Sequence, residues 1–240
     1  LKGRGVTTVE VGVQSLDDSV LRTAQRGHSS ADAVKAVALL KERGFKSGLH
    51  LMAGLPGEGP GGFAETVIRA VALRPDTVRI HPTLVLRDTP LADRFRGGEY
   101  LPLGMAEAVD LCKKALRAFT AAGISVIRLG LQTTPALEEP GSVVAGPFHP
   151  AFRTLVETAL FLEMATALLE AARADDDLGL SAKTGTSPQG VQFSVCPADL
   201  SNLCGYRRVN VAVLKSRFSV GEIRVVSDPA LPRLALVLAA

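Results

Sequence analysis

The feature that most constrains the fold is a regular alternation of strand-like and helix-like segments over residues 7–130. Strand-like segments lie at 7–13, which is rich in valine, and at 46–53, 76–84 and 124–130. The helix-like segments share apolar residues at helical spacing and lie at 16–23, 29–43, 61–73 and 105–122. This order predicts an α/β fold with parallel strands and right-handed crossovers. By itself, the pattern fits half of a (β/α) barrel and an open sheet equally well.

The pattern changes after residue 132. Residues 133–150 are rich in proline and glycine and predict a loop, followed by a long helix to about residue 173. Strands are expected at 191–195, 223–227 and 234–238, with mostly helix over 197–218. We therefore predict a partial barrel over 1–132, a loop, long helix and linker over 133–188, and a small α+β domain over 189–240.

The composition is that of an ordinary soluble globular protein, with 47% hydrophobic and 21% charged residues among 240. The net charge of +3 permits a polyanionic partner without indicating one. Cys112, Cys196 and Cys204 have no C-x-x-C spacing, which indicates reduced thiols and a cytoplasmic protein. We expect no membrane-spanning segment. Because the chain starts at Leu1 in what reads as the end of a helix, we expect a cut rather than a natural amino terminus.

Three motifs follow the first two strand-like segments in a fixed order. They are Glu10-Val11-Gly12-Val13-Gln14-Ser15-Leu16-Asp17, Arg26-Gly27-His28 and Gly54-Leu55-Pro56-Gly57. With this spacing, residues 5–130 resemble the carboxy-terminal half of a radical S-adenosylmethionine (SAM) barrel. The resemblance is to the branch that holds the elongator-complex catalytic subunit and oxygen-independent coproporphyrinogen III oxidase. It implies a TIM-like partial barrel with a small appended domain, and S-adenosylmethionine and a [4Fe–4S] cluster as cofactors of the full-length enzyme.

The resemblance also implies cofactor-binding residues at the strand ends. Gln14, with its neighbour Ser15, closes the first strand and faces the cofactor, and Arg26 pairs with its carboxylate. A guanidinium is a planar fork of donors that suits a carboxylate, although a solvated cation is the alternative. The other implied contacts lie at the ends of the next two strands and are His50, Met52, Gly54, Thr83 and Leu84. For His50 and Met52, ordinary core positions are the alternative.

The sequence contains no recognisable metal site. The resemblance implies a Cys-x3-Cys-x2-Cys loop for the cluster, and the spacing of Cys112, Cys196 and Cys204 cannot supply it. No pair of histidines has the spacing of a zinc site, so no metal ligand is assigned. We expect the missing loop to belong before Leu1, and the chain as given to be inactive with strand 7–13 left at an exposed edge. The catalytic residues are unknown.

Two functions of different classes remain. The first is the carboxy-terminal part of a radical SAM enzyme, acting on a tRNA base or on a small molecule of the tetrapyrrole type. The second is a cluster-less binding or scaffold protein; a metal-independent barrel enzyme is a weaker third, since the strand ends lack paired carboxylates. Arg207, Arg208, Lys215 and Arg217 form a basic patch that would permit a nucleic-acid partner. The favoured interpretation of this patch is a solvated face of a helix.

Overall fold

The computed structural model describes residues 1–174 and 190–239 and divides the chain into two compact units, Leu1–Arg153 and Thr154–Ala240. Segment 133–153, which was predicted to lie outside the barrel-like part, belongs to the first unit. Most of the predicted linker lies in 175–189, outside the described residues. Each unit is described separately below.

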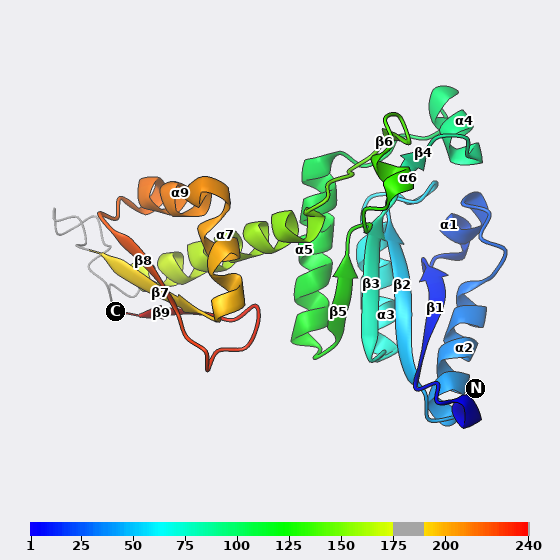
Figure 1. The fold of residues 1–240 in the computed structure, drawn as a ribbon, viewed down its shortest axis with the longest axis horizontal. Helices are drawn as coiled ribbons and strands as arrows, with labels where there is room; N and C mark the ends of the chain where they lie inside the picture. The colour runs from blue at the N-terminus through cyan, green and yellow to red at the C-terminus, as the bar shows by residue number, and fades with distance from the viewer. Residues whose placement is uncertain (175–189, 240) are drawn as a thin grey trace. The chain divides into compact units, whose positions relative to one another are not determined.

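The first unit is built on a four-stranded parallel sheet (Figure 1). The strands lie in the order β1 (Thr8–Gln14), β2 (Lys46–Ala53), β3 (Thr77–Pro82) and β5 (Ser125–Leu129). Before and between them come η1 (Lys2–Arg4), α1 (Asp18–Thr23), α2 (Ser30–Glu42), α3 (Gly62–Ala72) and α5 (Met105–Ala121). Neighbouring strands follow one another in sequence, which is the order of a (β/α) barrel. The predicted α/β, TIM-like architecture is confirmed.

Local sequence chemistry fixes where the helices begin. The side chain of Asp17 accepts hydrogen bonds from the first amides of α1, and Ser29 forms a reciprocal capping box with Asp32 at the start of α2. On the helix-covered face of the sheet, Val13, Leu51 and Ile80 are fully buried. The opposite face carries polar side chains and positions the candidate site.

A small antiparallel pair lies beside the carboxyl ends of the strands (Figure 1). It consists of β4 (Val85–Leu86) and β6 (Val143–Ala145), accompanied by α4 (Pro90–Arg96) and α6 (Pro135–Glu138). Val85, Ala92 and Tyr100 form its own buried cluster. The prediction of a plain loop over 133–150 was therefore wrong in part, because strands of two and three residues are too short to give an alternating pattern.

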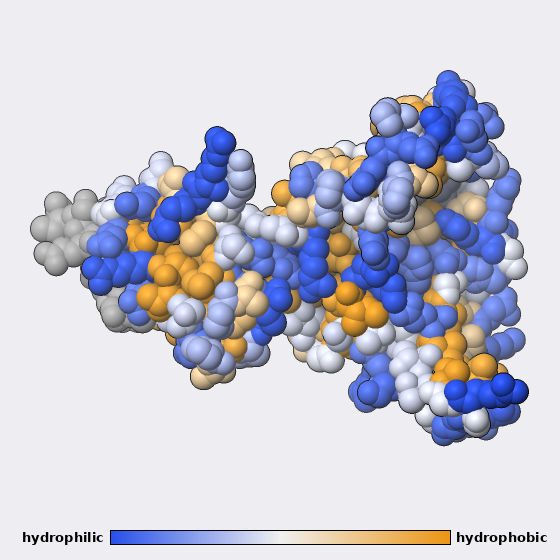
Figure 2. All heavy atoms as spheres, viewed as in Figure 1, coloured by the Kyte–Doolittle hydropathy of each residue, from blue (hydrophilic) through white to orange (hydrophobic). Residues whose placement is uncertain are grey.

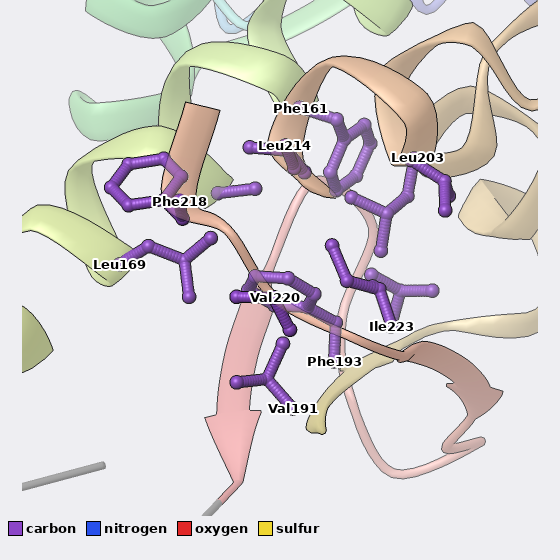
Figure 3. Close-up of a cluster of buried hydrophobic side chains, with 12 residues drawn as sticks. Phe161, Leu169, Val191, Phe193, Leu203, Leu214, Phe218, Val220 and Ile223 are labelled. Atoms are coloured by element: carbon purple, nitrogen blue, oxygen red, sulfur yellow. The ribbon is translucent and has the colours of Figure 1, made fainter. Parts of the chain in front are cut away.

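The second unit packs helices against a three-stranded sheet. Its elements are α7 (Phe152–Ala174, which begins in the first unit), β7 (Val191–Val195), η2 (Pro197–Asp199), α8 (Leu200–Cys204), η3 (Tyr206–Arg208), α9 (Val209–Phe218), β8 (Ile223–Ser227) and β9 (Leu236–Ala239). The strand order is β8-β7-β9, with β7 parallel to β8 and antiparallel to β9. Phe161, Phe193 and Leu214 are at the centre of the apolar core (Figure 3).

The three predicted strands of the second unit are confirmed, with β9 shifted by two residues at its start. The mostly helical structure expected over 197–218 is confirmed, and it is divided into η2, α8, η3 and α9. In the described part of the chain, none of the helices combines the length and apolar character needed to cross a bilayer.

Candidate functional site

A cavity of about 840 Å³ opens at the carboxyl ends of the strands of the first unit. Its lining includes Arg26 from the loop after α1, Met52 near the end of β2, and Thr83 and Leu84 directly after β3. Barrel and open α/β proteins bind ligands at this end of the sheet. The structure thus brings four of the eight predicted cofactor-binding residues to one cavity.

The loop that carries Arg26 is held rigidly at the end of β1. Gln25 and Gly27 on either side have left-handed backbone angles (φ 53° and 71°) and reverse the chain. His28 lies within hydrogen-bond distance of two backbone oxygens, at 3.1 Å from Arg26 O through Nδ1 and at 3.3 Å from Val13 O through Nε2. The Arg-Gly-His motif therefore fixes an arginine at the cavity.

The Arg26 guanidinium has no carboxylate partner among the residues that the structure describes. Its nearest polar contact is the Met52 sulfur, 3.1 Å from Nη2. Partial burial lowers the pKa of Arg26 from its ordinary value, which reflects the desolvation of an unneutralised cation. Such a group favours an anionic ligand, and a carboxylate matches its planar donors.

The cavity lining combines apolar residues with further polar ones. Arg94 and Glu99 pair with each other at 3.9 Å, and the threonines are Thr23, Thr83 and Thr89. Thr83 is buried, and its Oγ1 has no hydrogen-bond partner among the described residues. Its backbone amide donates to Ala53 O at 2.8 Å and thereby fixes the start of the loop after β3. A buried hydroxyl without a partner is costly unless a ligand satisfies it. The cavity therefore offers a cation, an unsatisfied hydroxyl and the apolar side chains of Met52 and Leu84.

Gln14 and Ser15 do not line this cavity. Gln14 leaves the strand with φ 54°, and its Nε2 lies only 2.6 Å from where a Cβ on Gly12 would be, so a side chain at position 12 would displace it. Ser15 is buried, with its hydroxyl 3.2 Å from Thr66 Oγ1, and so connects the end of β1 to α3.

Gly54 and His50 also lie outside the cavity lining. Gly54 has a left-handed backbone (φ 77°), and its carbonyl accepts a hydrogen bond from the Tyr100 hydroxyl at 2.6 Å. Its amide donates to Glu58, whose pKa burial raises to about 7. Gly54 therefore shapes the turn after β2 through its backbone.

His50 belongs to a row of polar side chains on the face of the sheet opposite the helices. Strand register aligns Gly12, His50, Arg79 and Arg128 across the four strands, so their side-chain positions share one face. Glu10 on the same face pairs with Arg79 at 2.8 Å. From the sequence, Arg128 on the last strand is a candidate to face the substrate, with a rim cation as the alternative, but the sequence does not connect it to His50 or Arg79. The sequence shows only which residues of each strand share a face. The register between strands, which shows that these residues lie next to one another, comes from the structure.

His50 and His81 form a directly bonded pair on this face. Nε2 of His50 lies 3.0 Å from Nδ1 of His81, and the two rings meet edge to face with centroids 4.3 Å apart. Burial, followed by the charges of neighbouring cations, lowers the pKa of His81 to about 4, and burial also lowers that of His50. Both rings are therefore neutral at pH 7. Nε2 of His81 is buried without a partner among the described residues, which leaves one ring nitrogen for a ligand.

Two family models match this chain. The model of the radical SAM superfamily matches residues 1–70, and the model of the Radical_SAM C-terminal domain matches residues 75–161. The chain belongs to the radical SAM superfamily. The family region includes the four strands of the first sheet, the cavity and the paired histidines.

Similar proteins point to the elongator-like branch of the radical SAM superfamily. A tRNA uridine(34) acetyltransferase of Methanocaldococcus infernus is 38% identical over 114 residues, which cover 46% of this chain and 21% of that protein. Elongator complex protein 3 of Danio rerio is 36% identical over 117 residues, covering 48% and 21%. The solved structure of archaeal Methanocaldococcus infernus Elp3 with residues 1–46 deleted has 30% identity and a TM-score of 0.55, covering 65% of this chain and 36% of that one. The match spans about a fifth of the length of the curated relatives.

The radical SAM family implies a [4Fe–4S] cluster, and the cysteines of this chain do not fit one. Cys112 is fully buried within α5, and burial raises its pKa to about 12, so it is a protonated thiol. Cys196 donates to the buried Asp199 carboxylate. Among residues 1–174 and 190–239, no three His, Cys, Asp or Glu side chains are grouped as metal ligands. S-adenosylmethionine, in contrast, fits the cavity, because Arg26 and Thr83 present an unneutralised cation and an unsatisfied hydroxyl.

Proposed function

We propose that this chain supplies the S-adenosylmethionine-binding, carboxy-terminal part of a radical SAM enzyme that modifies a tRNA base. The observation that carries this proposal is that the Arg26 guanidinium lies at the cavity without a carboxylate partner among the described residues, while His28 contacts the Arg26 backbone carbonyl. The substrate class follows from the relatives, several of which are named as tRNA uridine(34) acetyltransferases. The cluster ligands then come from outside residues 1–240.

In this superfamily, the cofactor supplies a 5′-deoxyadenosyl radical for hydrogen abstraction or addition. The residues of this chain bind and orient. Arg26 holds the carboxylate of the cofactor, Thr83 hydrogen-bonds to it, and Met52 and Leu84 provide apolar contact for the adenine. The polar face of the sheet receives the substrate.

The substrate-facing surface combines neutral and charged donors. The neutral His50–His81 pair can donate or accept a hydrogen bond at the free nitrogen of His81, while Arg128 supplies a positive charge. Arg128 has no ion-pair partner in the described part of the chain. This pattern suits a polar heterocycle next to an anionic group, which a nucleotide provides.

The test compares S-adenosylmethionine with its decarboxylated analogue, which lacks only the carboxylate. Binding of each to the chain is measured by equilibrium dialysis for the wild type, for Arg26→Gln, and for Arg43→Gln as a matched change at the exposed arginine that caps the end of α2. A charged hydrogen bond contributes about 1.5–3 kcal/mol, so loss of either partner weakens binding roughly 10- to 150-fold.

The two changes should not add, because they remove the same contact. We expect Arg26→Gln to bind both ligands equally and Arg43→Gln to behave as the wild type. Undiminished preference for the carboxylate form in Arg26→Gln would contradict the proposal. The alternative of a cluster-less binding protein is tested by anaerobic reconstitution of the full-length protein with iron and sulfide, followed by an assay for 5′-deoxyadenosine release. A protein that takes up no cluster supports the alternative, and a fully loaded protein that releases none contradicts the proposed function.

A further inference from the structure

The second unit has the element order of a known nucleic-acid-binding module. Strand β7 is followed by α8, a four-residue loop, α9 and strand β8. Leu203 of α8 and Leu214 of α9 pack with Phe193 of β7 in one apolar core (Figure 3). In KH modules, a G-x-x-G loop clamps the backbone of a single-stranded nucleic acid. The matched family models end at residue 161 and therefore assign nothing to β7, α8, α9 or β8.

The loop between the helices is Gly205-Tyr206-Arg207-Arg208. A Cβ on Gly205 would lie 2.9 Å from Val209 Cγ1, so the first position requires glycine. Arg207 and Arg208 both have left-handed backbones (φ 49° and 61°), a conformation that favours glycine. The fourth position of the loop therefore has a backbone conformation typical of glycine, although arginine occupies it. These two left-handed residues separate α8 from α9.

The side chains of the loop carry the chemistry that binds single strands. Tyr206 is 79% exposed, and the guanidinium carbon of Arg207 lies 5.2 Å from the centre of its ring. On α9, Val209 and Val213 are 49% and 41% exposed and, being four residues apart, share one helix face. Figure 2 shows hydrophilic residues over α9 with apolar residues below them on the same side of this unit. Aromatic stacking next to a cationic groove is how sequence-tolerant single-strand binding works.

The acidic residues near the loop already have partners. The described residues of the second unit, 154–174 and 190–239, contain seven Lys or Arg and six Asp or Glu, so only the positions of these charges can favour an anionic ligand. Asp199 is buried against Arg233, Glu222 pairs with Arg224, and Asp228 accepts from the amide of Ala230. Within the described residues, no carboxylate pairs with Arg207 or Arg208. The loop therefore carries two cations that suit an anionic ligand such as a phosphate, whereas Arg217 on α9 already pairs with Glu170.

We infer that the loop Gly205–Arg208 and the exposed face of α9 bind single-stranded nucleic acid. Tyr206 stacks on a base, Arg207 contacts a phosphate, and the left-handed backbone at Arg208 lets the strand approach closely. The inference stands independently of the proposed S-adenosylmethionine site, since it rests on the second unit alone.

The test measures binding of the full chain to labelled 12-nucleotide strands by fluorescence anisotropy at 50 and 200 mM salt. Single-stranded RNA and single-stranded DNA of the same sequence identify which nucleic acid is the ligand, and duplex RNA is the comparison. The matched pair is Arg207→Asp and Lys35→Asp, which make the same charge change at the loop and on exposed α2. Aspartate tolerates the left-handed conformation, so Arg207→Asp should keep the fold.

We expect single strands to bind at least 10-fold more tightly than the duplex. Arg207→Asp should lose at least 10-fold and Tyr206→Ala about 5-fold, whereas Lys35→Asp stays within 2-fold. Arg208→Gly creates a G-x-x-G loop and should retain binding within 3-fold. Absence of single-strand binding, equal losses in Arg207→Asp and Lys35→Asp, or loss of binding in a folded Arg208→Gly would each overturn the inference.

Discussion

The buried His81 makes a quantitative prediction about acid stability. Burial, followed by electrostatic interaction with His50 as it protonates and with Arg128 and Arg79, lowers the pKa of His81 from 6.5 to about 4. The unfolded chain takes up this proton below pH 6.5, whereas the folded chain does so only near pH 4. The penalty is therefore nearly absent above pH 6.5, grows as the pH falls, and levels off only below pH 4. Linkage gives a loss of about 2 kcal/mol of unfolding free energy between pH 7 and pH 5.

The measurement needs a reference variant, because Glu58 titrates with the opposite sign. His81→Phe keeps an aromatic ring beside His50 and cannot take up a proton. The chain has two tyrosines and no tryptophan, so Tyr206→Phe leaves the buried Tyr100 as the fluorescent reporter of the first unit. In that background, urea unfolding at pH 7 and pH 5 gives the change in stability with and without His81.

On going from pH 7 to pH 5, we expect the protein with His81 to lose about 2 kcal/mol more unfolding free energy than the protein with phenylalanine at this position. Equal pH dependence in the two proteins would refute the reasoning. A direct check is the titration of the His81 ring followed by NMR, where a midpoint near 6.5 instead of 4 would show that the ring is not held neutral by its surroundings.

Three further predictions concern folding. Gly54→Ala forces a Cβ to about 2.6 Å from Leu103 at a left-handed position and should cost about 1–3 kcal/mol in urea unfolding; an unchanged midpoint would show that the turn relaxes. Glu58, with its pKa raised to about 7 by burial, favours its neutral form, so stability should fall as the pH rises from 4.5 to 7. After allowance for partial exposure the loss is about 1–2 kcal/mol, and Glu58→Gln should abolish this slope in the same titration. Phe193→Ala should cost about 3–5 kcal/mol in the second unit, measured by circular dichroism, while the Tyr100 signal of the first unit keeps its midpoint.

The strand and helix alternation of the first unit was predictable because each strand buries one apolar face under helices. The fully buried Val13, Leu51 and Ile80 gave that signal directly. The β4–β6 pair was not predictable, since its strands have two and three residues. The break at Arg207 and Arg208 was also hidden, because arginine gives no sequence signal for a left-handed backbone.

The candidate site was predictable only as far as its motifs reach. Arg26, Met52, Thr83 and Leu84 meet at the cavity, as their places after successive strands indicated. The His50–His81 pair joins residues 31 positions apart, and only the register of β2 on β3 brings them together. Whether Gln14, Ser15, His50 and Gly54 contact the cofactor stays a prediction, as does a substrate of the tetrapyrrole type.

The imidazole of His28 couples the packing of strand β1 to the position of Arg26, the proposed ligand-binding residue. One ring nitrogen contacts the carbonyl of Arg26 and the other that of Val13, the penultimate residue of β1. Because the His28 ring lies between these two backbone oxygens, a displacement of the last residues of β1 would also displace the backbone of Arg26. Mutations that repack the strand will consequently also alter ligand affinity, and screens for stability in this region will recover binding variants as well.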